Sequence, residues 1–234
     1  MAWMLASFAD ALQLALTFDP KLFAIIGLTL QVSVTSAVVA ALVGGLIGAS
    51  VAVGRFRGRA AVIVLLNAAM GIPPVVAGLI VYLLLSRAGP LGSLGILFTP
   101  TAMVIAQVLL ITPIVAALSR QVIEDAWCEY EEQLTSLGVT RARAALTILW
   151  DTRFSLATVG LAGLGRAMAE VGAVMIVGGN IDGVTRVMTT AIALETTKGD
   201  LPLALALGVI LLTVVLLLNL AAHFVREWSV RNYG

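Results

Sequence analysis

Arg166 and Glu170 lie near the centre of an otherwise apolar run, and a hydroxyl-rich segment follows them. A charged side chain at that depth costs about 2.5 to 3.5 kcal/mol on an insertion scale, so neither can face lipid. A dehydrated oxyanion needs many hydrogen-bond donors and only a modest positive charge, because a stronger site would trap it. Hydroxyls, an amide and one or two arginines suit that task. The candidate donors after the pair are Asn180, Thr185, Arg186, Thr189 and Thr190.

Two further features could belong to the same pathway. Pro73 and Pro74 interrupt another apolar run, where they remove two backbone donors and force a kink or break. Gln107 is a polar residue within a third run. Each feature also has a purely structural reading: a packing kink for the prolines, and an i,i+4 ion pair for Arg166 and Glu170, in the less favourable order.

Several other chemistries are missing from the sequence. It contains no G-x-x-x-x-G-K-[ST] phosphate loop, no H-E-x-x-H and no G-x-S-x-G. One cysteine and one histidine predict no intrachain disulfide and no His/Cys metal site. An enzyme would have to depend on Glu170 alone, so we expect no catalytic residue, no metal and no cofactor in this chain.

The amino-acid composition indicates an integral membrane protein. The chain of 234 residues is 60% hydrophobic and 12% charged, with a mean hydropathy of +1.06. That leaves too few polar side chains to cover a soluble globule. The net charge of +1 gives no basic excess that would indicate nucleic acid.

The apolar runs predict an all-α integral membrane protein that forms one domain over residues 1–234. Five predicted spans cover residues 22–54, 60–86, 101–119, 154–178 and 201–225. Residues 2–18 are shorter than a span and contain Asp10, so we expect an interfacial helix there, with a sixth span as the alternative. Gly44 and Gly48 form a small-residue face on which another helix can approach closely.

A polar segment over residues 120–153 interrupts the apolar pattern with ten charged residues. Ile123, Trp127, Tyr130, Leu134 and Leu137 recur at helical spacing and predict an amphipathic helix of about four turns. Gly138 can adopt the left-handed conformation that ends a helix, and the Thr140 hydroxyl can cap the next one. The segment therefore predicts a helix, a sharp turn and a second helix outside the bilayer, although any polar loop between spans could also be helical.

The arginines predict the orientation. Nine of them fall in the 55–59 loop, the polar segment and the C-terminal tail, whereas Lys21, Arg87, Arg186 and Lys198 fall on the opposite side. The positive-inside rule then places the N-terminus outside and the C-terminus in the cytoplasm of a bacterial or archaeal plasma membrane.

The polar segment resembles the EAA loop of ABC importer permeases, in which a glutamate, a glycine and an isoleucine correspond to Glu132, Gly138 and Ile148. Gln133 and Leu134 replace the two alanines of the motif, and Trp150 and Asp151 replace its closing Leu-Pro. In that family the loop forms a coupling helix that docks on a cytoplasmic ATPase. The resemblance implies that the ATPase-coupling residues are Glu131, Glu132, Leu137, Gly138, Val139, Thr140 and Ile148.

Residues 165–199 are similar to a segment of the molybdate, sulfate and especially tungstate permeases. The matching elements are AEVGA at 169–173, GGNI at 178–181 and TR at 185–186, with PPVVAG at 73–78 and GPLG at 89–92 elsewhere. The resemblance implies a type I ABC importer permease that works as a homodimer with two ATPase subunits and an extracytoplasmic oxyanion-binding protein. ATP and Mg²⁺ would then bind to the ATPase.

Tungstate is the expected substrate, with molybdate or sulfate as alternatives. A secondary transporter or channel that acts alone is the alternative of another class.

Overall fold

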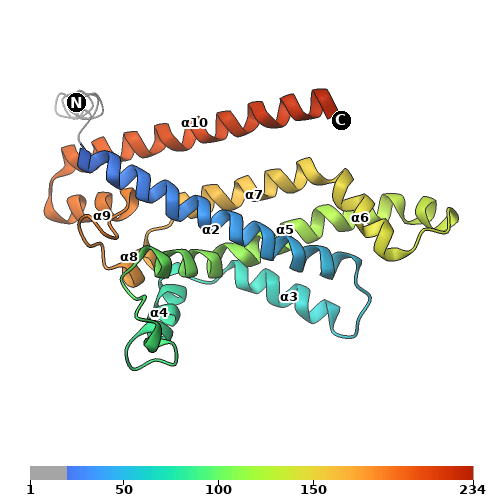
Figure 1. Cartoon of the computed structure of the whole chain (residues 1–234), viewed down its shortest axis with the longest axis horizontal. Helices are drawn as coiled ribbons and strands as arrows, with labels where there is room; N and C mark the ends of the chain where they lie inside the picture. The colour runs from blue at the N-terminus through green and yellow to red at the C-terminus, as the bar shows by residue number, and fades with distance from the viewer. Residues whose placement is uncertain (1–19, 234) are drawn as a thin grey trace.

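The computed structural model describes residues 20–233, which form helices joined by short turns (Figure 1). The predicted all-α fold is confirmed, since no strand occurs within this range. The helices are α2 (Pro20–Val53), α3 (Arg59–Met70), α4 (Pro74–Leu85), α5 (Pro100–Ser136), α6 (Arg141–Asp151), α7 (Arg153–Met168), α8 (Gly172–Gly178), α9 (Met188–Lys198) and α10 (Leu201–Tyr233), with the 3₁₀ turn η1 (Gly92–Leu94) between α4 and α5. The predicted interfacial helix at 2–18 lies outside the described residues.

Three of these helices, α2, α5 and α10, are long and apolar enough to cross a membrane. Two bent pairs bring the number to five if each pair crosses as one span: α3 with α4, at 100°, and α7 with α8, at 60°. The protein is therefore a multi-pass membrane protein. The break at Pro73 and Pro74 was predicted. The span predicted for 154–178 corresponds to α7 with α8, but its break was not predicted: the helix stops after Met168 and restarts at Gly172.

The longest helix, α5, continues from the apolar region into the polar segment. Its 37 residues make it about 55 Å long, well beyond the roughly 30 Å of a hydrocarbon core. The amphipathic helix predicted from residue 123 is thus not a separate element but the continuation of α5 beyond the third span. The predicted sharp turn and second helix follow, with α6 beginning at Arg141.

Close packing of α2 against α5 forms the centre of the bundle (Figure 1). A Cβ atom on Gly44 would lie 2.8 Å from the Thr112 carbonyl oxygen, and one on Gly48 would lie 2.6 Å from the Ala116 carbonyl oxygen. Only glycine permits this approach, so the predicted small-residue face is confirmed. Gly45, between them, has no atom of another element within 4 Å of its Cβ position.

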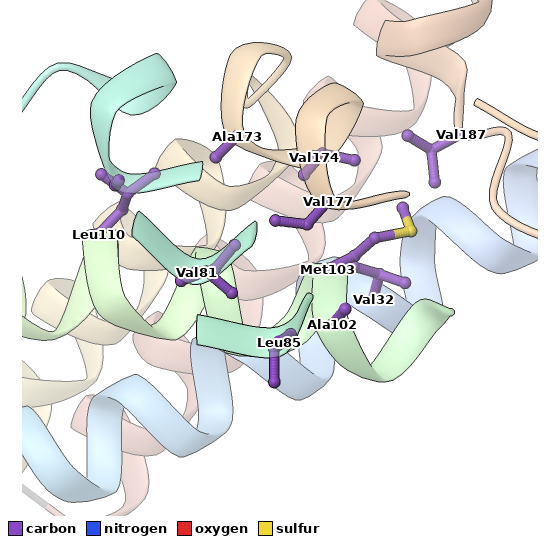
Figure 2. Close-up of a cluster of buried hydrophobic side chains, with 12 residues drawn as sticks. Val32, Val81, Leu85, Ala102, Met103, Leu110, Ala173, Val174, Val177 and Val187 are labelled. Carbon is purple, nitrogen blue, oxygen red and sulfur yellow. The ribbon is translucent and has the colours of Figure 1, made fainter. Parts of the chain in front are cut away.

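The largest buried apolar cluster joins the two broken spans to α5. Figure 2 shows Val81 and Leu85 of α4, Met103 of α5, and Val174 and Val177 of α8 converging in it. The contact between α4 and α8 is tight, since a Cβ atom on Gly78 would lie 2.7 Å from the Cα atom of Ala173. The half-helices that follow the two breaks therefore pack directly on one another.

We expect Gly48→Ala to force α2 away from α5, because the added methyl group has no room. Overpacking of this kind costs about 1 to 3 kcal/mol, so the thermal midpoint of the chain purified in detergent should fall. Gly45→Ala is the matched control and should keep or raise the midpoint, since alanine favours a helix and nothing opposes its side chain. Equal midpoints for the two variants would contradict the packing.

Candidate functional site

The break between α7 and α8 holds the charged pair. Arg166 lies in the last turn of α7, and its Nη1 atom is 3.0 Å from Oε2 of Glu170. The Glu170 side chain is 4% exposed, whereas that of Arg166 is 36% exposed. The other Glu170 oxygen, Oε1, accepts the Ala173 N–H at 3.1 Å. The i,i+4 ion pair that was considered as a structural alternative is therefore formed, and the same carboxylate satisfies a first-turn N–H of α8.

Three predicted threonines hold this break and the turn that follows it. The Thr189 hydroxyl donates to the Glu170 carbonyl at 2.8 Å. The Thr185 hydroxyl donates to the Gly178 carbonyl at 2.6 Å and accepts the Ile181 N–H at 3.0 Å. Thr190 exchanges hydrogen bonds with the backbone of Val187 at the start of α9. All three threonines are buried, so these hydroxyls stabilise the backbone of residues 170–190. Their contact with an anion stays a prediction.

Gln107 connects α5 to the same break. Its Nε2 atom donates to the Ala167 carbonyl at 3.1 Å, near the end of α7. Its Oε1 atom is buried and has no hydrogen-bond partner among the described residues. Because an unsatisfied buried acceptor is costly, this amide is a candidate for a contact made only when another molecule or state is present.

The proline break lies beside the glutamate break. Pro74 occupies the start of α4, where its missing N–H costs nothing, and the Pro73 carbonyl accepts the N–H groups of Val76 and Ala77. A Cβ atom on Gly172 would lie 3.0 Å from the Val75 side chain and 3.7 Å from that of Pro74. The structure thus places the proline break beside the break that contains Glu170, and Gln107 joins α5 to the end of α7, although the sequence placed these residues on three separate spans.

Asn180 and Arg186 lie on the turn between α8 and α9. Asn180 has a positive φ of 50° and donates to the Thr190 carbonyl at 3.4 Å. Arg186 pairs with Asp182 at 3.0 Å. It also lines a cavity of about 270 Å³ with Lys21 at the start of α2. Within residues 20–233, Asn180 and Arg186 therefore contact this turn, α9 and the start of α2, and neither is paired with Arg166 or Glu170.

The turn between α5 and α6 forms the second candidate surface. Gly138 has a φ of +66° and no neighbouring atom within 4 Å of its Cβ position, and the Val139 N–H donates to the Leu134 carbonyl at 3.1 Å. The predicted left-handed turn is confirmed. Thr140 precedes α6 in an extended conformation, but its hydroxyl makes no capping bond; the predicted cap is wrong, and the Thr140 carbonyl instead accepts the Ala144 N–H.

Exposure separates the predicted coupling residues into two groups. Ile148 is 1% exposed and packs with Ile123 and Ala52, so it holds α6 against α5 and α2. Leu137 is 75% exposed, and Glu132 is also exposed. Two further apolar side chains, Leu146 and Trp150 of α6, are 68% and 71% exposed, and they were not among the coupling residues predicted from the sequence. We call Glu132, Leu137, Leu146 and Trp150 the hairpin surface. Apolar side chains this exposed at the polar end of a bundle are typical of a protein-binding surface.

Comparison with curated proteins decides the family, although no family model matches the chain. A tungstate uptake system permease protein, TupB, of Peptoclostridium acidaminophilum is 37% identical over 227 residues, which cover 97% of this chain and 100% of that protein. TupB of Campylobacter jejuni is 38% identical over 169 residues, or 72% and 71% of the two chains. A protein of Haloferax volcanii named "Probable anion ABC transporter permease protein" is 38% identical over 217 residues, or 90% and 94%.

This chain belongs to the permease subunits of oxyanion ABC importers. The predicted resemblance is thereby confirmed. A permease subunit forms the membrane passage and is not itself the ATPase, in agreement with the absence of a phosphate loop from the sequence.

Ion pairs hold the end of the permease that carries the hairpin surface together. From the sequence, the arginines of these pairs served only to predict the orientation, and Glu131 was assigned to ATPase coupling. Arg59 donates from Nη2 to Glu124 at 2.7 Å and from Nε to the Val51 carbonyl at 2.8 Å. Arg120 also pairs with Glu124, and Arg55 pairs with Glu131 at 2.8 Å. These bonds tie the α2–α3 loop to the outer part of α5.

The Arg59 hydrogen bond lowers the pKa of the Glu124 carboxyl below its ordinary value. A lowered pKa means that the stabilisation from this carboxylate is present at neutral pH and is lost as the pH falls through the lowered value. The loop and the hairpin end are therefore held together under physiological conditions.

We expect Gly138→Val in the permease to impair coupling while the spans stay inserted. A β-branched residue at positive φ costs about 1 to 2 kcal/mol, so the turn that presents the hairpin surface should change conformation. Binding of the partner ATPase to the purified variant should fall, as should ATP-driven uptake in vesicles.

Gly95→Val is the matched control, because Gly95 also has a positive φ (+61°) and no atom within 4 Å of its Cβ position, but it follows η1 at a different turn. The control should bind the ATPase normally. ATP-driven uptake by the Gly138 variant at the control rate would refute a role for this turn in coupling.

Proposed function

We propose that this permease imports tungstate, as two copies that form a two-fold pathway with two cytoplasmic ATPases. The support for the substrate is the 37–38% identity to two proteins named as tungstate uptake permeases, together with the AEVGA, GGNI and TR elements of residues 169–186. Molybdate is a close competitor because it has nearly the same size and charge, and sulfate is a second alternative. Two-fold symmetry is the commonest symmetry among soluble homo-oligomers.

The anion passes, in this proposal, beside the two adjacent breaks. The observation that carries it is the exposure of the Arg166 side chain, 36% in a residue within the fourth span. A guanidinium at that depth is stable only against protein or water, so an exposed one indicates a polar passage or a subunit interface along such a passage. Five N–H donors in a planar fork suit an oxyanion.

The hairpin surface is the proposed docking site of the ATPase. It combines the exposed apolar side chains Leu137, Leu146 and Trp150 with the exposed carboxylate of Glu132. ATP and Mg²⁺ bind to that partner, which drives alternating access. The positive-inside rule puts this end in the cytoplasm, with the N-terminus outside, and an extracytoplasmic binding protein delivers the anion to the opposite end.

Reconstitution tests the substrate. The permease, its ATPase and its binding protein in proteoliposomes should accumulate radiolabelled tungstate only with ATP. Unlabelled tungstate and molybdate should compete strongly and sulfate weakly. Accumulation without ATP, or sulfate competing as well as tungstate, would overturn the proposal.

In the same assay we expect Arg166→Ala to lower the initial rate of tungstate uptake at least about tenfold, because a hydrogen bond to a charged group contributes about 1.5 to 3 kcal/mol. Assembly with the ATPase should persist, as judged by co-purification. Arg57→Ala, in the exposed α2–α3 loop, is the control and should transport normally. Wild-type uptake by the Arg166 variant would reduce Arg166 to a structural residue.

A further inference from the structure

Glu170 is fixed in place on three sides. Its Oε1 atom accepts the Ala173 N–H at 3.1 Å, its Oε2 atom lies 3.0 Å from Arg166, and its own carbonyl accepts the Thr189 hydroxyl at 2.8 Å. With 4% of its side chain exposed, the carboxylate cannot swing into water. It is a stationary negative charge at the break between α7 and α8.

Arg166 is held much less tightly than its partner. Its contact with Glu170 is an ion pair from Nη1 to Oε2 at 3.0 Å, and its side chain is 36% exposed whereas that of Glu170 is 4% exposed. Within residues 20–233 no second acceptor is paired with this guanidinium. With 36% of its side chain exposed, the guanidinium has N–H groups available to an acceptor from outside the chain, while Glu170 stays on one side of it.

We propose that Glu170 is a built-in counter-anion that weakens the hold of Arg166 on the transported oxyanion and so permits release; this rests on the proposed function. An Arg166 without a counter-charge, at low dielectric, would attract a dianion strongly and trap it. The fixed carboxylate repels the dianion from one side. In the empty state it also compensates the arginine, whose charge would otherwise be unpaired in the membrane.

The geometry favours this role over a purely structural one. A residue needed only to accept the Ala173 N–H could be neutral, since an amide oxygen accepts the same bond. An ion pair needed only for stability gains little from the Arg-before-Glu order or from an arginine that is 36% exposed. A buried, immobile carboxylate beside an open guanidinium suits the tuning of an anion site.

Equilibrium binding of radiolabelled tungstate tests the proposal, using the permease–ATPase complex in nanodiscs without the binding protein. Glu170→Gln keeps the acceptor for Ala173 and removes the charge, so the dissociation constant should fall at least about tenfold. Maximal uptake in proteoliposomes should fall because release is slower. The added affinity should disappear in the double variant with Arg166→Ala.

Glu195→Gln is the matched control: Glu195 pairs with Lys198 within α9 at 2.8 Å, away from the break, and this variant should bind and transport as wild type. If the Glu170→Gln complex does not assemble, Glu170→Asp retracts the carboxylate by one methylene from Arg166 and should tighten binding by a smaller factor. Unchanged or weaker binding in an assembled Glu170 variant overturns the counter-anion role alone. Failure of the wild-type complex to take up tungstate refutes the proposed function instead.

Discussion

An interrupted helix inside a bilayer leaves backbone N–H and C=O groups that only protein or enclosed water can satisfy. Two spans are interrupted here, with bends of 100° and 60°. At the break between α7 and α8, side chains supply hydrogen-bond partners for the backbone. Gln107 donates to the Ala167 carbonyl, Thr189 donates to the Glu170 carbonyl, and the Glu170 carboxylate accepts the Ala173 N–H. These side chains come from α5, α9 and the break itself. The need to pair the backbone N–H and C=O groups of the break therefore requires α5 and α9 to pack against it.

The same constraint links the break between α7 and α8 to the hairpin surface. α5 carries Gln107 at the break and ends one residue before Leu137 of the hairpin surface. It is clamped along its length, by Gly44 and Gly48 of α2 and by the Arg59–Glu124 and Arg55–Glu131 pairs near its outer end. A displacement of the hairpin by an ATPase would therefore reach the break through one helix, without an intervening loop.

Features encoded in local sequence could be predicted from it. The apolar runs, the Pro73–Pro74 break, the small-residue face and the left-handed Gly138 all depend on residue type or spacing. The break at 169–171 carries no such signal, because alanine and glutamate favour helices and no proline or glycine lies within it. It depends on Thr189 and Gln107, which are distant in sequence.

Two other features depended on more than residue type. The continuity of α5 was missed because the change from apolar to polar residues at 119–120 was taken as the end of a helix, although helical spacing continues across it. Within the candidate site, the sequence named the members of the Arg166–Glu170 pair but did not predict their unequal burial. It also did not predict the proximity of the two breaks, because this comes from the packing of α4 on α8.

The most direct test of the account is whether α5 moves as one rigid helix during the ATPase cycle. Spin labels on the chain's one cysteine, Cys128, and on Ile105→Cys, both exposed positions, should be separated by about 34 Å along the helix. The labelled chain is diluted with cysteine-free chain so that only distances within one subunit are measured. The account predicts the same distance in the ATP-free and ATP-bound transporter. A distance that shortens on ATP binding would show that α5 bends at Pro113, which would contradict direct transmission from the hairpin to the break.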